Sequence, residues 1–435
     1  MVRSYLHYRV LYLADDEEVV SSGTGTGAGR CQSVRAKYQP PMLRFGRPSA
    51  LDSGGPWFDG IYSLGTGPHG QTIAMGMVPG GHWATADSGK SWQRIFESRR
   101  NHSQPEKQMD SEYTPAWQDD TWNAVVDVPA SSASSLSMHN LGNISAAAAA
   151  QVNASTVCTP EVARWSWKGE WTREVEPRQL CFYGVPNAGA RGISFRKTGG
   201  SHVRLADDKT LLLTVMLPLD PGRTGGKPSI ICFGSTDGGY AWHYRGTIAR
   251  PDDVPQSREG PNENALTLLA DGQTILCIMR LDAGDRGGFL PYARSFSSDG
   301  GYSWSLPALM GHGIGSARPR LLRVASGSGH SLLLSGGRTW GANRDVFLWL
   351  NANGDGVDWA PQFSISYWHN LLEPNASRHF TPHGVNHSTH WPRECTSYTS
   401  LIATGAATAA VVYNLAVHIN GSFYGGGFSM PVMLA

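Results

Sequence analysis

Charged residues are scarce in this chain: Asp, Glu, Lys and Arg make up only 16% of its 435 residues. Long exposed helices need many such residues, whereas 52 glycines and 15 tryptophans favour numerous turns and aromatic side chains packed on sheets. We therefore expect an all-β chain. Because 36 basic residues balance 35 acidic ones, we expect no nucleic-acid partner, and an anionic ligand must be bound by a few local arginines.

Long apolar runs are also missing. No stretch reaches 18 apolar residues, so we expect no membrane span. The first residues, Met1 to Tyr5, do not begin a convincing signal-peptide core. The glycines of residues 23–27 are not followed by the lysine and helix of a phosphate-binding loop.

The six cysteines and 15 histidines show no spacing typical of a metal site, so we expect neither metal nor cofactor. Cys158 and Cys181 could form a disulfide across a loop, but connectivity cannot be read from sequence. Six N-x-S/T sequons indicate a glycoprotein that is secreted or lumenal, which conflicts with the weak amino-terminal signal and leaves the compartment open. The sequons begin at Asn101, Asn143, Asn153, Asn375, Asn386 and Asn420.

Three segments share the pattern S/T-x-D-x-G-x-x-W: residues 85–92, 235–242 and 297–304. A fourth copy, residues 351–359, is degraded and carries one extra residue. Asp and Gly suit a tight turn, because Asp bonds nearby backbone and Gly tolerates positive φ. The closing Trp can bury against the sheet to which the turn belongs. Such repetition predicts an architecture built of repeated units.

This pattern resembles the Asp box (BNR repeat) of the sialidase, or neuraminidase, β-propellers. In those proteins the box is a folding staple on the outside of a blade, not a catalytic site. The resemblance implies a six-bladed β-propeller of four-stranded antiparallel blades. The tryptophans Trp242, Trp304 and Trp359 are spaced as expected for one blade each.

The chain divides into an irregular lead-in, residues 1–50, and the propeller, residues 51–435. A loop insertion is expected at about 100–155, because this stretch holds a serine-rich run and an alanine tract. Buried strands are predicted from apolar runs. They lie at residues 211–215, 265–269, 274–279, 332–334 and 346–350.

Residues 259–280 predict a β-hairpin with Asp271 and Gly272 at its turn. Glu263 opens the first strand and Arg280 closes the second, so antiparallel pairing places them at the same end. On the residues alone, a simple salt bridge is an equally good interpretation, and such a pair is worth little when exposed.

The resemblance to sialidases implies roles for these residues. In that family a hairpin of this form carries the Glu that activates the nucleophile and the second of three arginines that bind the substrate carboxylate; Glu263 and Arg280 match them. Arg344 matches the third arginine, with Arg338 in reserve. Tyr398, within Ser-Tyr-Thr-Ser-Leu, resembles the nucleophilic tyrosine.

The chemistry of sialic acid explains these residue types. Its anomeric carbon carries a carboxylate that repels a carboxylate nucleophile, and tyrosine is the known exception among glycosidases. A phenol with a pKa of about 10 attacks poorly until a base takes its proton, which is the role implied for Glu263. Arginine suits the carboxylate because its planar fork donates two parallel hydrogen bonds.

The first blade departs from the family pattern. Neither the expected arginine triplet nor the aspartate acid/base has a counterpart in residues 55–64 and 77–83. Arg44 or Arg47 could replace the arginine and His82 could donate a proton, but none of them matches a motif.

Three further arginines are weaker candidates. Arg196 lies in a locally similar triplet, but one blade before Glu263, where a ring of six would misplace it. Arg318 and Arg320 could point towards the centre from the fifth blade.

We therefore expect a retaining exo-sialidase that removes terminal sialic, or another nonulosonic, acid from sialylated glycans. The alternative is a glycan-binding propeller that kept the carboxylate grip and lost turnover, since losing leaving-group protonation costs roughly a hundredfold to ten-thousandfold. A third possibility is a structural adhesion propeller, against which the chain order Glu, Arg, Arg, Tyr argues.

Overall fold

The computed structural model describes most of the chain from residue 43 onward. The described residues are 43–51, 60–66, 72–78, 81–97, 113–118, 121–127, 156–158, 162–167, 171–176, 181–184, 196–207, 209–219, 224, 226–283, 290–311, 313–315, 317–327, 329–337, 345–381, 393–394, 399–419 and 422–434.

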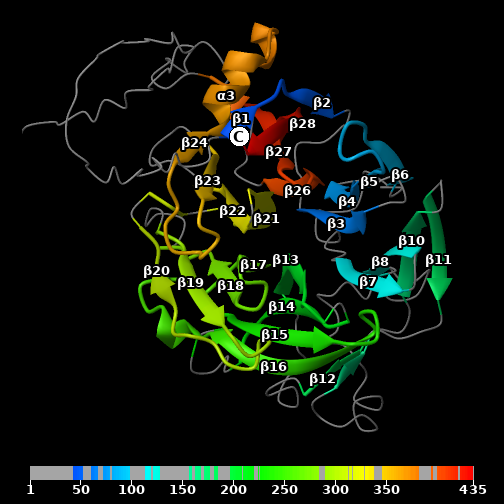
Figure 1. Ribbon diagram of the computed structural model, residues 1–435, viewed down its shortest axis with the longest axis vertical. Coiled ribbons are helices and arrows are strands. Elements are labelled where there is room, and N and C mark those ends of the chain that lie inside the picture. Colours follow the sequence, from blue (N-terminus) through cyan, green and yellow to red (C-terminus); the bar gives the residue numbers. More distant parts are fainter. Residues whose placement is uncertain are drawn as a thin grey trace, which may run out of the picture. The chain divides into compact units, whose positions relative to one another are not determined.

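This part of the chain is built mostly of β-strands (Figure 1). Its few helical segments are α3 (Ile365–Leu372) and the single turns η2 (Pro251–Asp253) and η3 (Ala376–Arg378). The strands form six sheets, four of which have four strands. The β3 sheet contains β3 (Gly60–Thr66), β4 (Thr72–Val78), β5 (Gly81–Thr85) and β6 (Gln93–Glu97), and the β7 sheet contains β7 (Tyr113–Gln118), β8 (Thr121–Asp127), β10 (Val162–Trp167) and β11 (Trp171–Glu176). The β17 sheet contains β17 (Asn264–Leu268), β18 (Ile275–Met279), β19 (Ala293–Ser297) and β20 (Ala308–Leu309). The β21 sheet contains β21 (Arg320–Ser326), β22 (Gly329–Gly336), β23 (Phe347–Asn351) and β24 (Gln362–Ser364).

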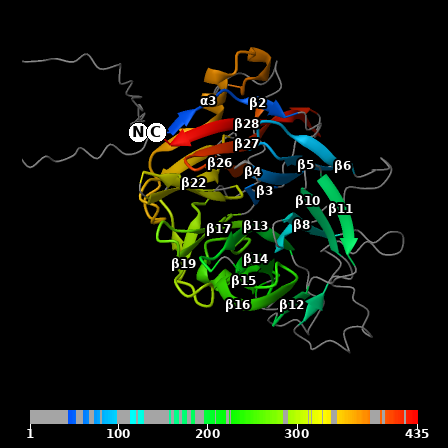
Figure 2. The ribbon, with the colours of Figure 1, turned by 45° about the vertical axis from the view of Figure 1, so that its right-hand side comes forward.

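The other two sheets have six strands each. The β13 sheet contains β13 (Arg196–Arg204), β14 (Leu211–Leu217), β15 (Ser229–Ser235), β16 (Ala241–Ala249), β12 (Cys181–Tyr183) and β9 (Val157–Cys158). The β26 sheet contains β26 (Ser400–Gly405), β27 (Thr408–Ile419), β28 (Ser422–Leu434), β25 (Arg393–Glu394), β1 (Leu43–Phe45) and β2 (Ser49–Leu51). Figure 2 shows β26, β27 and β28 side by side.

Strands β1 and β2 fall within the stretch that the sequence predicts to be an irregular lead-in. Both pair antiparallel with β28, the last strand of the chain. An uncovered edge of β28 would leave a row of backbone N–H and C=O groups without partners, and these short strands supply them. Likewise, β7 and β8 lie within the stretch expected to be a loop insertion.

Neighbouring sheets pack face to face, and β18 shows how. All five of its residues are buried. Ile275, Cys277 and Met279 belong to a core cluster with side chains of β14 and β15, whereas Leu276 and Ile278 join a cluster with side chains of β22 and β23. Because successive side chains of a strand point to opposite faces, the β17 sheet is covered on both sides. This double burial explains why the central strands are continuously apolar.

The predicted buried strands are found as β14, β17, β18, β22 and β23. The expectation of a chain made mostly of β-strands is thus confirmed. Closure of the six sheets into a six-bladed propeller stays a prediction.

In all four repeat turns, residues 85–92, 235–242, 297–304 and 351–359, the first side chain bonds both the Asp and a glycine amide of the turn. The closing Trp donates to a glycine carbonyl in the last three turns, whereas Trp92 Nε1 makes no such bond. In the third, Ser297 Oγ donates to Asp299 Oδ1 at 2.9 Å and accepts from the Gly301 amide at 2.9 Å. The indole of Trp304 donates to the Gly301 carbonyl at 3.0 Å. Gly301 has a φ of 94°, the left-handed region that glycine adopts without strain.

The degraded fourth turn keeps this scheme with a different first residue. Asn351 Oδ1 accepts from the Gly356 amide at 3.0 Å, and its Nδ2 donates to Asp355 Oδ1 at 2.8 Å. Trp359 donates to the Gly356 carbonyl at 3.1 Å. The amide of Asn351 therefore replaces the hydroxyl of Ser or Thr as both donor and acceptor.

Candidate functional site

Glu263 and Arg280 lie at the same end of the β17–β18 hairpin, as antiparallel pairing predicts. The Arg280 amide donates to the Glu263 carbonyl at 2.8 Å, directly beyond the register pair Asn264 and Met279. Arg280 Nη1 donates to Glu263 Oε2 at 2.8 Å. Glu263 is only 5% exposed, so this is a buried pair rather than the weak surface salt bridge that the sequence also allows.

Arg280 is held by a second carboxylate. Its Nη2 donates a short hydrogen bond to Asp282 Oδ2, and Asp282 is buried as well. Two buried carboxylates therefore fix the plane of one guanidinium. An arginine has five N–H donors in a rigid fork, so binding a third carboxylate lies within its capacity.

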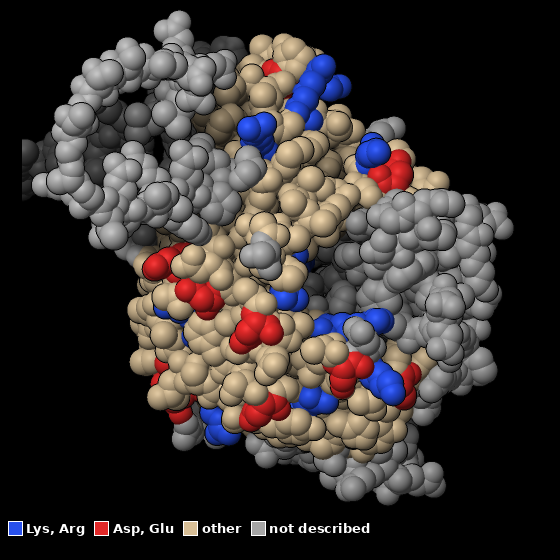
Figure 3. Space-filling view, viewed as in Figure 1, with Lys and Arg blue, Asp and Glu red and all other residues tan. Residues whose placement is uncertain are grey.

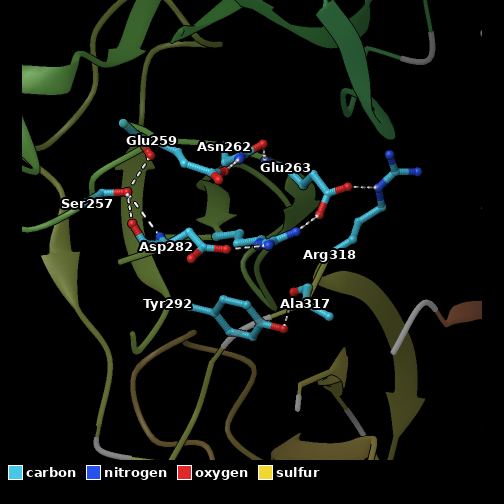
Figure 4. A network of polar contacts seen from close by, with 10 residues as sticks. Ser257, Glu259, Asn262, Glu263, Asp282, Tyr292, Ala317 and Arg318 are labelled. Carbon is cyan, nitrogen blue, oxygen red and sulfur yellow. Dashed lines mark hydrogen bonds and ion pairs between the residues drawn. The ribbon is translucent and has the colours of Figure 1, made fainter. Parts of the chain in front are cut away.

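The loop before β17 is tied to the same hairpin end. Ser257 Oγ donates to the Gly260 carbonyl at 2.6 Å and accepts from the Asp282 amide at 3.0 Å. The Glu263 amide donates to Asn262 Oδ1 at 2.8 Å, and Asn262 Nδ2 donates to Glu259 Oε2 at 2.8 Å. These bonds order the backbone that carries Glu263, and Glu259 adds a half-buried carboxylate nearby (Figure 4).

A second arginine meets this cluster from the segment that leads into β21. Arg318 Nε donates to Glu263 Oε1 at 3.3 Å, and Arg318 is 4% exposed. Figure 4 shows the Glu263 carboxylate reaching towards Arg318. Arg320, two residues further along the chain, is also buried. The sequence offered no motif for Arg318; its only signal was its expected place in the fifth blade, from which it could point towards the centre.

A hydrogen bond between two hydroxyl groups connects the β21 sheet to the segment that enters the β26 sheet. Ser335 Oγ and Thr399 Oγ1 are 2.8 Å apart, and both residues are buried. Ser335 is the register partner of Arg320. Thr399 directly follows Tyr398 in the chain. The Ser335–Thr399 bond therefore links the residue that follows Tyr398 in the chain to the strand that pairs with Arg320.

The contacts described above do not include several residues that the sequence predicts for the site. Tyr398, Arg344 and its reserve Arg338 lie outside the described residues. Arg44 and Arg47 are described, and both side chains are exposed. His82 and Arg196 belong to β5 and β13, and only their backbone positions are described.

The described cysteines are unsuited to nucleophilic chemistry. Burial raises the pKa of the Cys232 thiol to about 12, and burial beside Cys232 raises that of Cys277 well above its ordinary value, so both stay protonated. Cys181 is disulfide-bonded, and in the strand register it stands opposite Cys158, the partner considered from the sequence.

Within the described ranges, no group of three or more His, Cys, Asp or Glu side chains is placed to hold a metal ion. A search of the same ranges finds no helix that combines the length and apolar character of a membrane span. In Figure 3, basic and acidic side chains of the described residues are interspersed on the visible face.

No protein-family model matches the chain, and no curated protein matches it. Among solved structures, a protein of unknown function from Dyadobacter fermentans is similar, with a TM-score of 0.54 and 13% identity over 90% of this chain and 99% of that one. At this level of identity the likeness shows a shared fold and nothing further.

Two glycoside-cleaving enzymes show weaker likeness. A Trypanosoma rangeli sialidase in complex with sialic acid has a TM-score of 0.47 and 12% identity, covering 91% of this chain and 59% of that one. A Penicillium chrysogenum α-L-arabinanase complexed with arabinobiose has a TM-score of 0.46 and 13% identity, covering 91% and 98%. The present chain thus spans somewhat more than half the length of that sialidase chain.

Proposed function

We propose that this chain is a sialidase-like glycoside hydrolase with a β-propeller fold. Its substrates are glycans that end in sialic acid or a related acidic sugar, and hydrolysis retains the anomeric configuration. Tyr398 is the nucleophile, Glu263 its base, and Arg280 and Arg344 bind the substrate carboxylate.

The observation that carries this proposal is the buried contact between Glu263 and Arg280. Burying two ionised side chains at the end of a hairpin costs free energy that a purely structural role repays only with good geometry. Here the pair is fixed by Asp282 and by the ordered loop of Ser257 and Asn262. A preorganised base beside a preorganised carboxylate receptor is what the proposed reaction needs.

In the proposed reaction, Tyr398 Oη bonds to the anomeric carbon while its proton passes to Glu263. The glycosidic C–O bond breaks, and the leaving oxygen takes its electron pair. An alkoxide leaving group needs a proton at this moment, whereas an aryl oxide leaves without one. Water then bonds to the anomeric carbon and releases one proton to solvent, the bond from that carbon to Tyr398 Oη breaks, and Glu263 returns its proton to the phenolate oxygen.

A glycan-binding protein without turnover is the second candidate. It is favoured by the absence of arginine from residues 55–64 and of carboxylate from residues 77–83, where the resemblance expects a substrate-binding arginine and the proton donor. Such a protein keeps the carboxylate-binding arginines and lacks leaving-group protonation.

Two substrates distinguish these functions: a methylumbelliferyl sialoside, whose aryl oxide leaves unaided, and sialyllactose, which needs a proton donor. An active enzyme with its own donor hydrolyses both. One that lacks the donor hydrolyses only the aryl sialoside. The binding protein hydrolyses neither and binds free sialic acid in calorimetry. If the folded chain shows no turnover and no binding of sialic acid, both candidates are overturned.

The role of Tyr398 is tested by Tyr398→Phe, which we expect to lower kcat on the aryl sialoside by at least roughly a hundredfold. Tyr302→Phe is the matched control, because Tyr302 is 60% exposed on a repeat turn. Equal activity of the Tyr398 variant and this control contradicts a tyrosine nucleophile at position 398.

A further inference from the structure

Each oxygen of the Glu263 carboxylate is bound by a different arginine. Arg280 Nη1 is 2.8 Å from Oε2, and Arg318 Nε is 3.3 Å from Oε1. The two arginines come from different sheets: Arg280 ends the β18 hairpin, and Arg318 precedes β21. The side chains of all three residues are at most 11% exposed. The family resemblance implies no role for the contact between Arg318 and Glu263.

The backbone of Arg318 is fixed to the β17 sheet, where Glu263 lies. Tyr292 Oη donates to the carbonyl of Ala317, the preceding residue, at 2.5 Å, and Tyr292 is completely buried (Figure 4). Gly336 has a φ of 146°, and a Cβ there would lie 2.4 Å from Tyr292 Oη and 3.1 Å from the Arg318 carbonyl. Tyr292 and the close approach of Gly336 thus hold Arg318 at a set distance from Glu263.

A general base must be both ionised and correctly aimed. A carboxylate bound at one oxygen can rotate about its terminal torsion, which is soft, whereas bonds at both oxygens fix its plane. A nearby cation also favours the ionised form. Each carboxylate oxygen has two lone-pair sites, so a bond from one arginine leaves room on that oxygen for a phenol proton.

We propose that Arg318 is a positioning residue for Glu263: it fixes the plane of the carboxylate and keeps it ionised for proton transfer from Tyr398. This inference rests on the proposed function. Among the described residues, the other charged groups that hydrogen bonds connect to Glu263 are Arg280, Asp282 through Arg280, and Glu259 through Asn262. Arg318 acts through Glu263 and is distinct from the arginines assigned to the substrate carboxylate.

The test compares the pH profile of kcat/KM on the aryl sialoside for the unaltered chain, Arg318→Met and Arg318→Lys. Removing the cation in Arg318→Met moves the acid limb upward by about one pH unit, with a fall in kcat larger than any rise in KM. Arg318→Lys keeps the charge, so its acid limb returns towards that of the unaltered chain. An acid limb that does not move in folded Arg318→Met overturns the proposal.

Arg323→Met is the matched control. Arg323 lies on β21 in the same segment, is half-buried, and bonds to the Ala270 carbonyl at 3.1 Å and to His330 at 3.0 Å, away from Glu263. We expect this variant to lose some stability and to keep the acid limb in place. An equal shift of the limb in Arg323→Met contradicts a specific role for Arg318.

A second measurement separates this proposal from the proposed function. Urea unfolding of Arg318→Met, Glu263→Gln and the double variant forms a cycle that needs no turnover. Coupling between the two sites, seen as a double variant less destabilised than the sum of the single variants, supports positioning of Glu263 by Arg318. Additive effects overturn it. If the unaltered chain lacks turnover, the catalytic consequence fails with the proposed function, and this cycle alone decides whether Arg318 positions Glu263.

Discussion

Ser335 and Thr399 share a hydrogen bond between two hydroxyl groups that are both buried, with 2.8 Å between the oxygens. The two residues are far apart in the chain and come from different sheets, β22 and the segment entering β26. This bond sets the position of the backbone that follows Tyr398 against the strand that pairs with Arg320. It therefore links the residue that follows Tyr398 in the chain to the strand that pairs with β21.

Thr399→Val tests this contact, since valine keeps the shape and removes the hydroxyl. The Ser335 hydroxyl is then buried without its partner, which costs about 1–3 kcal/mol of unfolding free energy. We also expect kcat on the aryl sialoside to fall, with KM little changed, because the residue next to the proposed nucleophile, Tyr398, loses its bond to β22. Urea unfolding and steady-state kinetics measure the two effects.

The double variant Ser335→Ala with Thr399→Val is the control. Removing both hydroxyls leaves neither buried group unsatisfied, so stability should recover relative to Thr399→Val alone. Activity should stay low, because the bond between the two residues is still missing. If kinetics return to normal in the double variant, the bond serves stability only.

Arg280→Met removes the cation that Glu263 and Asp282 share. Glu263 keeps Arg318, whereas Asp282 loses the arginine that binds it, and removing one partner of a buried ion pair costs about 3–5 kcal/mol. We expect this loss in urea unfolding, and no detectable binding of sialic acid in calorimetry. Asp282→Asn in the same background should restore part of the stability without restoring binding. Sialic acid binding that survives Arg280→Met in a folded variant contradicts the role of Arg280 in holding the carboxylate.

The sequence predicts the strands and repeat turns well because each depends on local chemistry. Asp299 and Gly301 specify their turn within eight residues, and the apolar run of β18 reflects burial on both faces. Strands β1 and β2 could not be predicted in the same way. Both are only three residues long, and β1 has one buried, one exposed and one half-buried side chain, so neither has an apolar pattern. They form strands because the edge of β28, near the other end of the chain, pairs with them.

The candidate site was predicted only where its residues lie on one hairpin. Asp271 and Gly272 fix that hairpin, and its register brings Glu263 and Arg280 together. Arg318 meets Glu263 across 55 residues of sequence, through packing of two sheets. No spacing rule encodes that distance, so the sequence does not predict this contact.

The repeat turns should stabilise the fold through their aspartates. Burial raises the pKa of the Asp299 carboxyl, but hydrogen bonds from Ser303, Ser297 and Tyr302 outweigh it and hold the pKa at about 2, below the ordinary 3.8. The ionised form is therefore favoured in the fold, and its contribution to stability is present above pH 3.8 and lost as the pH falls towards 2. Because Asp299 is exposed, solvent screening keeps this contribution modest.

Asp299→Asn should therefore lower the unfolding free energy by on the order of 1 kcal/mol at neutral pH, with a smaller difference near pH 3. Asp358→Asn is the matched control, because Asp358 is an exposed aspartate of the fourth repeat turn whose backbone carbonyl, at 2.8 Å from Asn351 Nδ2, makes the contact there. Activity at neutral pH should be unchanged in both variants. A catalytic defect in folded Asp299→Asn contradicts the purely structural role of the turn.

His369 should make the fold sensitive to acid. Its side chain is fully buried in α3, with Nδ1 at 2.8 Å from Tyr413 Oη and Nε2 at 2.8 Å from the Arg378 carbonyl. Burial lowers its pKa from the ordinary 6.5, against smaller opposing effects of the Arg378 carbonyl and Glu373, while His379 lowers it slightly further. The unfolded chain therefore binds a proton more readily than the folded one, and stability falls as the pH drops below 6.5.

This sign gives a direct test with His369→Gln, which cannot titrate. Between pH 7.5 and 5, the unaltered chain should lose more unfolding free energy than the variant, by about 1.4 kcal/mol for each pKa unit that separates folded from unfolded. His243→Gln, at an exposed histidine of β16, is the control and should follow the unaltered chain. Parallel pH curves for the unaltered chain and His369→Gln would mean that acid acts on another group. The buried contacts of His369 with Tyr413 and the Arg378 carbonyl would then not be the acid-sensitive element of the fold.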